Sequence, residues 1–400
     1  MTEKQKDEDI YKMKTIRDVV IVAYGRSPIG RSAKGSLAKE YPTQFAATVL
    51  NGVLKRVDRL PLEQIDDVIV GCAKHEVMQG KNMARIICQA AGLPDCIPAQ
   101  TINRFCSSGL QSVATGANAI MAGQADIIVA GGVESMSMLP MNVSDPAAYD
   151  PLLMKENPGI YIPMGLTAEN VAEEYGITRT EMDAFALESQ RRAARAREEG
   201  KFRKEIIPVP FTDADGNRCL LYEDECIRAN TSMEKMSTLS PCFKEDGLVT
   251  AANSSGTSDG AAFIVLMSVE KALELDIKPI ARFLGFVSTG VNPEYMGIGP
   301  MKAVPRLMKL LDMEPGQFDV IELNEAFAAQ AIPCIRTLGL SLDKVNPRGG
   351  ALALGHPLGA TGSILLCKAL SYLEDTKGTY GLITMCIGGG MGAAGAIEML

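Results

Sequence analysis

The same order of strand-like and helix-like segments occurs twice in this chain, once in its first third and once in its last. The strand-like runs of the first third lie at 19–23, 65–71, 98–102 and 125–130, and its helical patterns at 43–57, 83–91 and 109–122. The last third has strand-like runs at 279–287, 319–323 and 380–385, and helical patterns at 301–311, 325–338 and 360–373. Alternation of this kind predicts a parallel or mixed sheet covered by helices on both faces. The repetition predicts an internal duplication into two similar α/β halves, with residues 102–103 corresponding to 345–346.

The middle of the chain, residues 134–247, breaks this alternation. It carries Met-rich and Pro-rich loops and a charged helical pattern at 179–200 that includes R-R-A-A-R-A-R. Carboxylates such as Asp183 and Glu188 interleave with these arginines, so we interpret the helix as a solvated face and not as a nucleic-acid site. We expect an inserted loop domain that covers or lines a site between the halves. The expected division is residues 1–133 with 248–277, then 134–247, then 278–400.

Composition narrows the class of protein. A chain of 400 residues with 46% hydrophobic content can bury a large core. A net charge of −8 and a pI near 5.1 argue against bulk nucleic-acid binding. A phosphate-bearing ligand remains compatible, because a few basic side chains and helix N-termini can hold it locally.

Cysteine usage and the termini bear on location. Ten cysteines without a Cys-x-x-Cys pair indicate a reducing compartment, and we expect a cytoplasmic protein. No apolar run approaches the roughly 18 residues of a membrane span. Residues 1–9 are acidic and lack an apolar stretch, so we expect a disordered tail and not a targeting peptide. The final E-M-L is not a peroxisomal signal.

Cys106 is the first candidate for chemistry. It lies in N-R-F-C-S-S-G at 103–109, between a strand-like run and a helix rich in small residues. A thiol at a helix N-terminus meets free N–H groups and the positive end of the helix dipole, which favour the thiolate. Cysteine is often merely buried, but the small hydroxylated neighbours here favour a nucleophile that carries an acyl group as a thioester.

His356 is one of only two histidines, and it lies in the Gly-rich segment G-H-P-L-G at 355–359. A core or metal-ligating histidine is the alternative, but no cluster of carboxylates or histidines stands nearby in the sequence. We therefore expect a base that activates a cysteine. The other histidine, His75, lies in a polar loop and is expected to be non-catalytic.

Two further candidates lie at strand ends in the last third. Cys386 follows a buried strand and precedes I-G-G-G, where glycines free the backbone to present N–H donors to an oxyanion. A second thiol there suits an acid/base that moves a proton to and from carbon. Asn324, in N-E-A-F, can hold a water or a carbonyl oxygen, and a helix N-cap is its alternative role. Ligand sites of such sheets lie at the strand carboxyl ends.

Together these motifs resemble the thiolases, the acetyl-CoA acyltransferase family, from about residue 17 to the C-terminus. The resemblance rests on N-R-F-C-S-S-G-L-Q, G-G-V-E-S-M-S, M-G-L-T-A-E-N, N-E-A-F, G-H-P-L-G-A-T-G and C-I-G-G-G-M-G. It implies a five-layered α-β-α-β-α fold of two similar halves with a loop domain. It also implies coenzyme A as a substrate, with no further cofactor and no metal.

The resemblance implies a role for each candidate. His356 would take the proton from Cys106, and the thiolate would attack a 3-ketoacyl-CoA. Cys386 would protonate the departing acetyl-CoA enolate and later deprotonate incoming CoA. His356 with a water on Asn324 would form one oxyanion site, and the N–H groups of Cys106 and Gly388 would form the other.

Coenzyme A recognition is also carried by the resemblance. It would place Arg228 near the adenine and Ser255 on the pantetheine arm. The tunnel would be lined by Met164, Phe243, Ala251, Ala326 and Phe327. Core packing is the alternative for Met164, Phe243 and Phe327.

The residues of these motifs are closer to those of degradative 3-ketoacyl-CoA thiolases than to those of biosynthetic acetoacetyl-CoA thiolases. Short-chain biosynthetic members have a histidine where this chain has Pro163. The acetoacetyl-CoA enzyme stays an alternative. So does a β-ketoacyl synthase-like condensing enzyme, although Cys386 argues against it. A non-catalytic acyl-CoA- or lipid-binding relative would have lost a thiol or the histidine. The family further implies a homodimer or homotetramer, paired through an exposed edge strand after the Cys106 helix.

Overall fold

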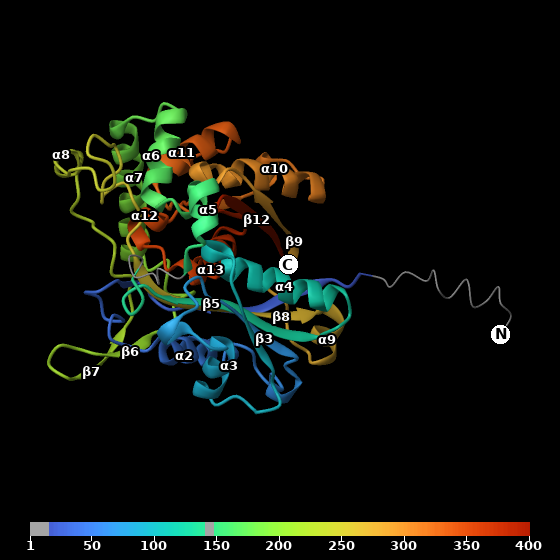
Figure 1. Cartoon of the computed structure of the whole chain (residues 1–400). Coiled ribbons are helices and arrows are strands. Elements are labelled where there is room, and N and C mark those ends of the chain that lie inside the picture. The colour runs from blue at the N-terminus through green and yellow to red at the C-terminus, as the bar shows by residue number, and fades with distance from the viewer. Residues whose placement is uncertain (1–15, 141–147) are drawn as a thin grey trace.

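The computed structural model describes residues 16–140 and 148–400 (Figure 1), so the acidic segment 1–9 lies outside the described residues. Its strands are β1 (Val19–Arg26), β2 (Gly30–Arg31), β3 (Asp67–Gly71), β4 (Ala99–Ile102), β5 (Ile127–Ser135), β6 (Val209–Thr212), β7 (Arg218–Leu221), β8 (Ser258–Ser268), β9 (Ala281–Gly290), β10 (Val320–Leu323), β11 (Tyr380–Ile387) and β12 (Met391–Met399). Its α-helices are α2 (Pro42–Leu54), α3 (Met83–Ala90), α4 (Ser108–Met121), α5 (Pro151–Glu156), α6 (Met164–Glu174), α7 (Arg179–Glu198), α8 (Met233–Ser237), α9 (Val269–Glu274), α10 (Gly299–Leu311), α11 (Ala328–Thr337), α12 (Ala351–Leu354) and α13 (Leu358–Thr376). Short 3₁₀ helices are η1 (Leu62–Gln64), η2 (Val77–Gln79), η3 (Phe105–Ser107), η5 (Pro158–Tyr161), η6 (Pro293–Ile298) and η7 (Pro315–Gln317).

The strands repeat one spatial order in the two halves of the chain. The large sheet of the described residues runs β10-β11-β12-β9-β1-β8-β5-β3-β4, and β2 pairs with β8. Its first-half part is β4-β3-β5-β8-β1, and its second-half part is β10-β11-β12-β9. An isolated parallel bridge between Ile321 and Val345 extends the second part where β4 extends the first. The two parts therefore have the same order, which confirms the predicted duplication.

The two parts meet only at their ends. β9 pairs with β1 over Val20–Arg282 and Ile21–Ala281, so the half-sheets join into one mixed sheet. Elsewhere the half-sheets are separated by α4 and α13, which pack on β5, β8 and β11. The joint between the half-sheets was not predicted from the sequence.

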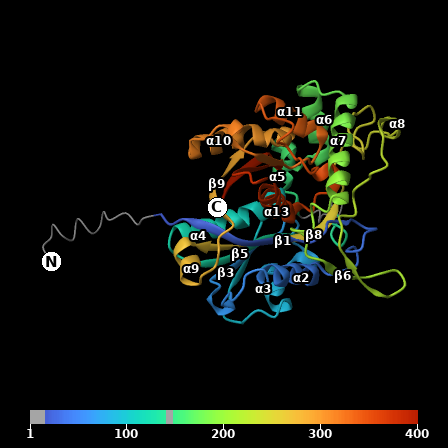
Figure 2. The ribbon, with the colours of Figure 1, turned by 180° about the vertical axis from the view of Figure 1, so that it is seen from behind.

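The helices complete a layered arrangement that Figures 1 and 2 show from opposite sides. α2 and α3 cover the outer face of the first half, while α10 and α11 cover the outer face of the second. Residues alternate along β5, with Ile128 facing α4 and Val129 facing α2 and α3, as the period-two geometry of a strand requires. The result is the five-layered α-β-α-β-α order that the resemblance implied.

Glycines allow the two central helices to approach closely. A Cβ on Gly109 would lie 2.8 Å from the Gly359 carbonyl oxygen, and one on Gly362 would lie 2.4 Å from the Leu110 nitrogen. Neither distance is compatible with a side chain, so the small residues of α4 and α13 are required by packing. This contact brings together the beginnings of the helices that follow Cys106 and His356.

The prediction that the strand after the Cys106 helix forms an exposed edge was wrong. The strand that follows the Cys106 helix is β5, and it lies inside the sheet between β8 and β3. The edge is β4, which precedes Cys106 and pairs only with β3. The crossover through α4 carries the chain back over β3, so order along the sequence differs from order in the sheet.

The middle segment adds helices and a hairpin to one end of the molecule. α6 and α7 pack on α11, and α7 also packs on α12, while β6 and β7 form a separate two-stranded hairpin. β5 continues to Ser135, so the expected boundary between 133 and 134 falls inside this strand. The helices built from residues 16–140 and 148–400 include none that combines the length and apolar character needed to cross a membrane.

Candidate active site

Cys106 lies in a tight turn between the edge strand β4 and the central helix α4. The preceding residue, Phe105, has φ of 43°, a left-handed conformation that is unusual for a bulky side chain. The turn is held by the Asn103 side chain, which accepts from the Phe105 N–H at 2.8 Å. Ser108 Oγ accepts from the Arg104 N–H and donates to the Phe105 carbonyl. The local sequence thus fixes the strained turn that presents the thiol.

Cys386 is the last residue but one of β11 and is fully buried, next to a glycine turn whose Gly388 N–H donates to Cys106. Gly389 and Gly390 have φ of 76° and 80°, and a Cβ on Gly390 would lie 2.4 Å from the Val291 oxygen. Cys106 packs on the cluster of Met385, Ile387 and Ala393 around the end of β11. The two thiols, which are 280 residues apart in the sequence, therefore share one site.

The charge state of Cys106 differs from the expectation. Burial raises the pKa of the Cys106 thiol to about 11, although hydrogen bonds from the backbone N–H groups of Gly388 and Cys106 lower it. Burial also raises the pKa of Cys386 well above its usual value, and the nearby Cys106 raises it further. The N–H groups at the helix N-terminus favour the thiolate, as expected, but desolvation outweighs them. Both thiols are neutral at rest, so a base is needed.

His356 follows α12 in a loop that Gly355, with φ of 99°, makes possible. Its Nδ1 lies 2.6 Å from Thr361 Oγ1, and that hydroxyl donates to the Pro357 carbonyl at 3.1 Å. Since the hydroxyl proton is used there, Thr361 accepts from Nδ1–H, and Nε2 keeps its lone pair. Burial lowers the pKa of His356 to about 4, so the ring is neutral and Nε2 is a proton acceptor.

Thr361 was not among the residues picked out from the sequence. It stands five positions after His356, in G-H-P-L-G-A-T-G. A hydroxyl one turn into the following helix can reach back to a histidine, so this spacing was the available signal.

Asn324 lies beside His356 at the end of β10. Its Nδ2 is 3.4 Å from His356 Nε2, and its backbone N–H donates to the Thr384 carbonyl at 2.9 Å. Its Oδ1 is buried and has no hydrogen-bond partner among the described residues. The N-cap alternative is wrong, because α11 begins at Ala328 with Phe327 as its N-cap. An amide so placed can orient a polar atom next to the histidine.

A cavity of about 950 Å³ lies next to the histidine loop. Four of the residues expected to bind coenzyme A line it, namely Arg228, Phe243, Ala251 and Ser255. Gly256 and Thr257 also line it, and the Gly256 carbonyl accepts from the His356 N–H at 3.0 Å. The cavity therefore reaches the backbone of the histidine loop.

The other three expected residues, Met164, Ala326 and Phe327, do not line this cavity. They belong to a hydrophobic cluster that includes Cys386, and the rings of Phe243 and Phe327 meet edge to face with centroids 6.1 Å apart. Met164 Sδ lies 3.5 Å from where a Cβ of Gly388 would be. The structure thus places these three around the second thiol and the glycine turn.

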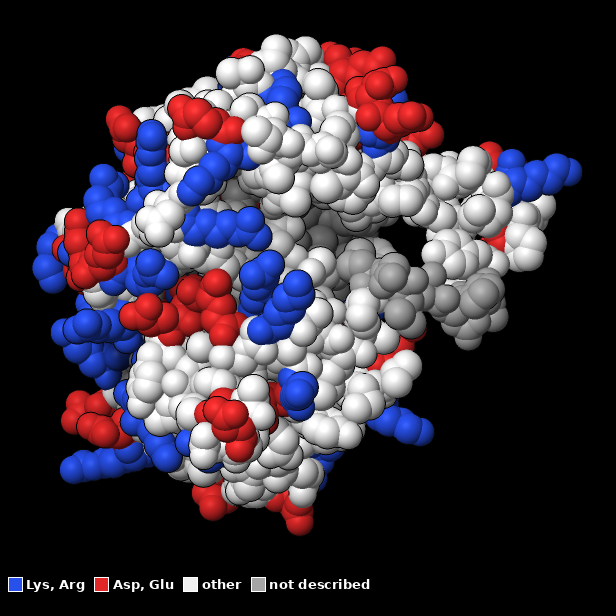
Figure 3. All heavy atoms as spheres, turned by 90° about the vertical axis from the view of Figure 1, so that its left-hand side faces the viewer, with Lys and Arg blue, Asp and Glu red and all other residues white. Residues whose placement is uncertain are grey.

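The cavity has a positive lining although the chain is acidic. Lys and Arg side chains gather on the face of the molecule that Figure 3 shows. Those that line the cavity are Arg31, Lys34, Arg197, Arg228 and Lys235. Glu225 is the acidic residue among the lining side chains. Such a lining can hold the phosphate groups of a ligand.

His75 takes no part in these contacts. It is exposed, and its ring contacts the Lys81 carbonyl. Within 16–140 and 148–400, no three His, Cys, Asp or Glu residues are grouped so that they could hold a metal ion.

Comparisons with known proteins match both halves. The family described as "Thiolase, N-terminal domain" matches residues 19–270, and "Thiolase, C-terminal domain" matches residues 277–399. The chain is 47% identical over 394 residues to a protein of Bacillus subtilis (strain 168) named 3-ketoacyl-CoA thiolase, covering 96% of this chain and 100% of that one. A beta-ketoadipyl-CoA thiolase of Pseudomonas aeruginosa is 44% identical over 400 residues, covering 96% and 99%. The dimeric peroxisomal thiolase of Saccharomyces cerevisiae has a similar structure, with a TM-score of 0.89 and 39% identity over 98% of this chain and 100% of that chain.

Proposed function

Because the chain belongs to the thiolase family of acyltransferases, we propose that it is a 3-ketoacyl-CoA thiolase acting in fatty acid β-oxidation. It would cleave a 3-ketoacyl-CoA with CoA to acetyl-CoA and a shortened acyl-CoA. The observation that carries this proposal is the neutral His356, whose Nε2 is kept as an acceptor by Thr361, together with two thiols that lie close to each other. This arrangement supplies a base, a nucleophile and a second acid, none of which is itself charged at rest.

The first half-reaction transfers the acyl group to the enzyme. His356 Nε2 takes the proton of Cys106 as its sulfur attacks the 3-keto carbon, so the ion pair forms only during attack. The bond between C2 and C3 then breaks. Cys386 gives its proton to C2 of the leaving enolate, which departs as acetyl-CoA, and Cys106 is left as a thioester.

The second half-reaction releases the acyl group. Cys386, now a thiolate, takes the thiol proton of incoming CoA. The CoA sulfur attacks the thioester carbonyl, Cys106 leaves, and His356 returns the proton to Cys106. The N–H groups of Gly388 and Cys106, which already point at the sulfur, support an oxyanion site. Asn324 beside His356 supports the other site.

Coenzyme A would lie in the 950 Å³ cavity. We assign Arg228 to the adenine end and Ser255 to the pantetheine arm, with Phe243 and Ala251 as apolar walls. Met164, Ala326 and Phe327 would surround the reacting end, as their packing with Cys386 supports. The molecule is a substrate here, and the proposal includes no other cofactor and no metal.

The identity of the acyl group in the substrate is the most specific part of the proposal. Relatives named for 3-ketoacyl-CoA and for beta-ketoadipyl-CoA are of similar identity. Pro163, in place of the histidine of short-chain biosynthetic members, favours degradation over acetoacetyl-CoA synthesis. An acetoacetyl-CoA thiolase running toward condensation is the second candidate. A non-catalytic acyl-CoA-binding relative is remote, because Cys106, His356 and Cys386 are all present.

Assembly, domain limits and location complete the proposal. We propose a homodimer or homotetramer with pairing through the β4 edge, since the yeast relative is named as dimeric. The division into 1–133 with 248–277, 134–247, and 278–400 stays a prediction, as does the cytoplasmic location.

The test is CoA-dependent cleavage of 3-ketoacyl-CoAs of increasing chain length, followed by loss of the absorbance of the magnesium enolate. Cleavage of medium or long chains supports the degradative enzyme. Activity confined to the four-carbon substrate would favour the acetoacetyl-CoA enzyme. No cleavage by a folded wild-type protein would overturn the proposal.

A further inference from the structure

Two buried carboxylates hold the His356 loop from opposite sides. Glu325 Oε2 accepts from the Leu352 N–H at 3.2 Å, four residues before the histidine. Glu134 Oε2 accepts from the Gly359 N–H at 2.8 Å, three residues after it. Glu325 is 2% exposed and Glu134 is 0% exposed. The loop that carries the base is thus fixed at its entry and at its exit by carboxylates.

Glu134 links the histidine loop to the first half of the fold. It lies near the end of β5, and it also accepts from the Ala73 N–H at 2.8 Å and from Gln79 Nε2 at 2.6 Å. A Cβ on Gly359 would lie 2.7 Å from the Ala73 nitrogen and 2.9 Å from Glu134 Oε2, so the contact leaves no free space. Glu134 therefore sets the beginning of α13 against the loop after β3.

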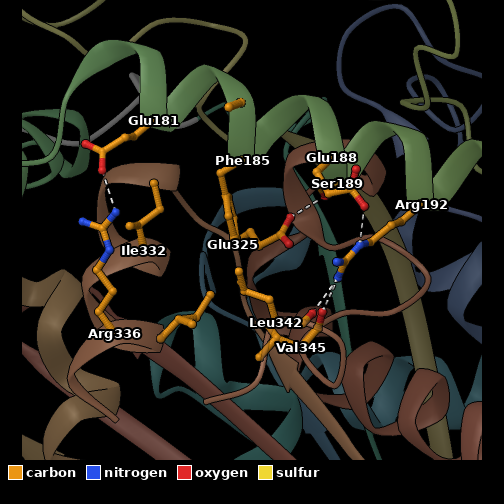
Figure 4. A pocket seen from close by; sticks show the side chains of 12 residues that line it. Glu181, Phe185, Glu188, Ser189, Arg192, Glu325, Ile332, Arg336, Leu342 and Val345 are labelled. Carbon is orange, nitrogen blue, oxygen red and sulfur yellow. Dashed lines mark hydrogen bonds and ion pairs between the residues drawn. The ribbon is translucent and has the colours of Figure 1, made fainter. Parts of the chain in front are cut away.

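Glu325 links the same loop to the second half and to α7. It directly follows Asn324, and its Oε1 accepts from Asn346 Nδ2 at 2.7 Å. Ser189 Oγ on α7 donates to Glu325 Oε2 at 2.6 Å, and the Gly350 N–H donates to Ser189 Oγ at 3.0 Å. Figure 4 shows Glu325 reaching toward Ser189 beside a cavity of about 330 Å³.

Each oxygen of both carboxylates accepts from at least one N–H or NH₂ group, which can only donate, and this makes the carboxylate form specific. Gln79 cannot turn its amide to compensate, because its Oε1 accepts from the Ser135 N–H at 2.6 Å. Asn346 is fixed in the same way, since its Oδ1 accepts from the Leu323 N–H at 3.0 Å. A glutamine at either position would place an NH₂ group against another buried donor.

We propose that Glu134 and Glu325 are positioning residues for catalysis, which together hold the His356 loop and so keep Nε2 in place beside Asn324. Neither would touch the substrate. Their effect rests on the proposed function, because it is exerted through the base of that reaction. Displacement of a catalytic group by about 1 Å can cost on the order of 100-fold in rate, so small shifts of this loop are enough.

The experiment compares wild type with E134Q, E325Q, the double variant and the milder S189A. Turnover gives kcat and KM for the 3-ketoacyl-CoA and for CoA. The alkylation rate of Cys106 by iodoacetamide, followed by mass spectrometry of its peptide, needs no acyl substrate. Thermal unfolding shows which variants are folded. E205Q is the matched control, because Glu205 is equally buried but is bonded to Arg26 and not to the histidine loop.

We expect kcat to fall about tenfold or more in E134Q and E325Q, with KM within about twofold. The double variant should lose less than the product of the single losses, since both act on one loop. S189A should lose a smaller part of the rate. E205Q should lower the melting temperature and leave kcat within about twofold.

The alkylation rate of Cys106 distinguishes a displaced His356 from the loss of the Glu134 charge. Glu134 raises the pKa of Cys106 through its charge, so E134Q alone would speed alkylation. Slower alkylation in folded E134Q would therefore report a displaced His356. Folded variants with wild-type kcat and alkylation rates, or with raised KM at unchanged kcat, would overturn the proposal. If wild type cleaves no 3-ketoacyl-CoA, the proposed function fails, while the alkylation comparison still tests the loop.

Discussion

Replacement of Thr361 by valine tests how the base is prepared. Valine keeps the shape of threonine but cannot accept from His356 Nδ1–H, which is now 2.6 Å from Oγ1. The buried Nδ1–H would then lack a partner, at a cost of about 1–3 kcal/mol. The ring can avoid this cost by moving its proton to Nε2, but that tautomer cannot accept the proton of Cys106.

The expected loss in kcat follows from this free energy. At about 1.4 kcal/mol per factor of ten, 1–3 kcal/mol corresponds to about 5- to 150-fold. KM should change little, because Thr361 is buried and does not line the 950 Å³ cavity that we propose for coenzyme A. The assay is steady-state cleavage of a 3-ketoacyl-CoA, with alkylation of Cys106 as a second measure. T361S is the control, since serine keeps the hydroxyl and should restore most of the rate. Folded T361V with wild-type kcat would refute the assigned tautomer.

Three further outcomes follow from the site. C106A should abolish turnover and keep the fold, because alanine suits a small turn position; circular dichroism and thermal unfolding check this, and residual cleavage above background would contradict it. C386S should still acylate Cys106 but slow proton transfer to carbon, which single-turnover mass spectrometry and exchange of the acetyl-CoA methyl protons in deuterated water would resolve; normal turnover would disprove the two-thiol mechanism. For His356, the folded pKa of about 4 lies below the usual value of 6.5, so the unfolded chain binds the extra proton and stability is lost as pH falls through that window. The free energy of unfolding of wild type should fall by about 3 kcal/mol relative to that of H356N between pH 6.5 and 4, as measured by denaturant unfolding. A difference between the two proteins that does not change with pH would contradict this.

Much of the fold could be predicted from the sequence, because each half is built from short buried strands and helices with distinct periodicity. The predicted strand at 19–23 is β1, and the predicted helix at 109–122 is α4, shifted by one residue. β8 and β12 were not predicted. β12 is rich in glycine and alanine and has Ile397 as its one β-branched residue, so it lacks the usual signal of a strand, whereas β8 contains the run F-I-V-L and could have been predicted.

The helix predicted from residue 325 begins at Ala328, which removed the N-cap role for Asn324. The backbone N–H of Asn324 instead donates to the Thr384 carbonyl of the neighbouring strand β11. A partner from another strand competes with the local helix signal, and sequence periodicity contains no information about it.

The sequence by itself determined which chemical groups are available: two thiols, a histidine and an amide in or next to turns, and the glycines that let the backbone approach them. These follow from residue type and local spacing. Tertiary structure decided their protonation, because the pKa of Cys106 and of His356 depends on how much water the surrounding layers exclude. It also decided that β4 is the edge, and that Glu134 and Glu325, which are 191 residues apart in the sequence, hold one loop. Desolvation and long-range pairing arise only when the two halves pack on each other.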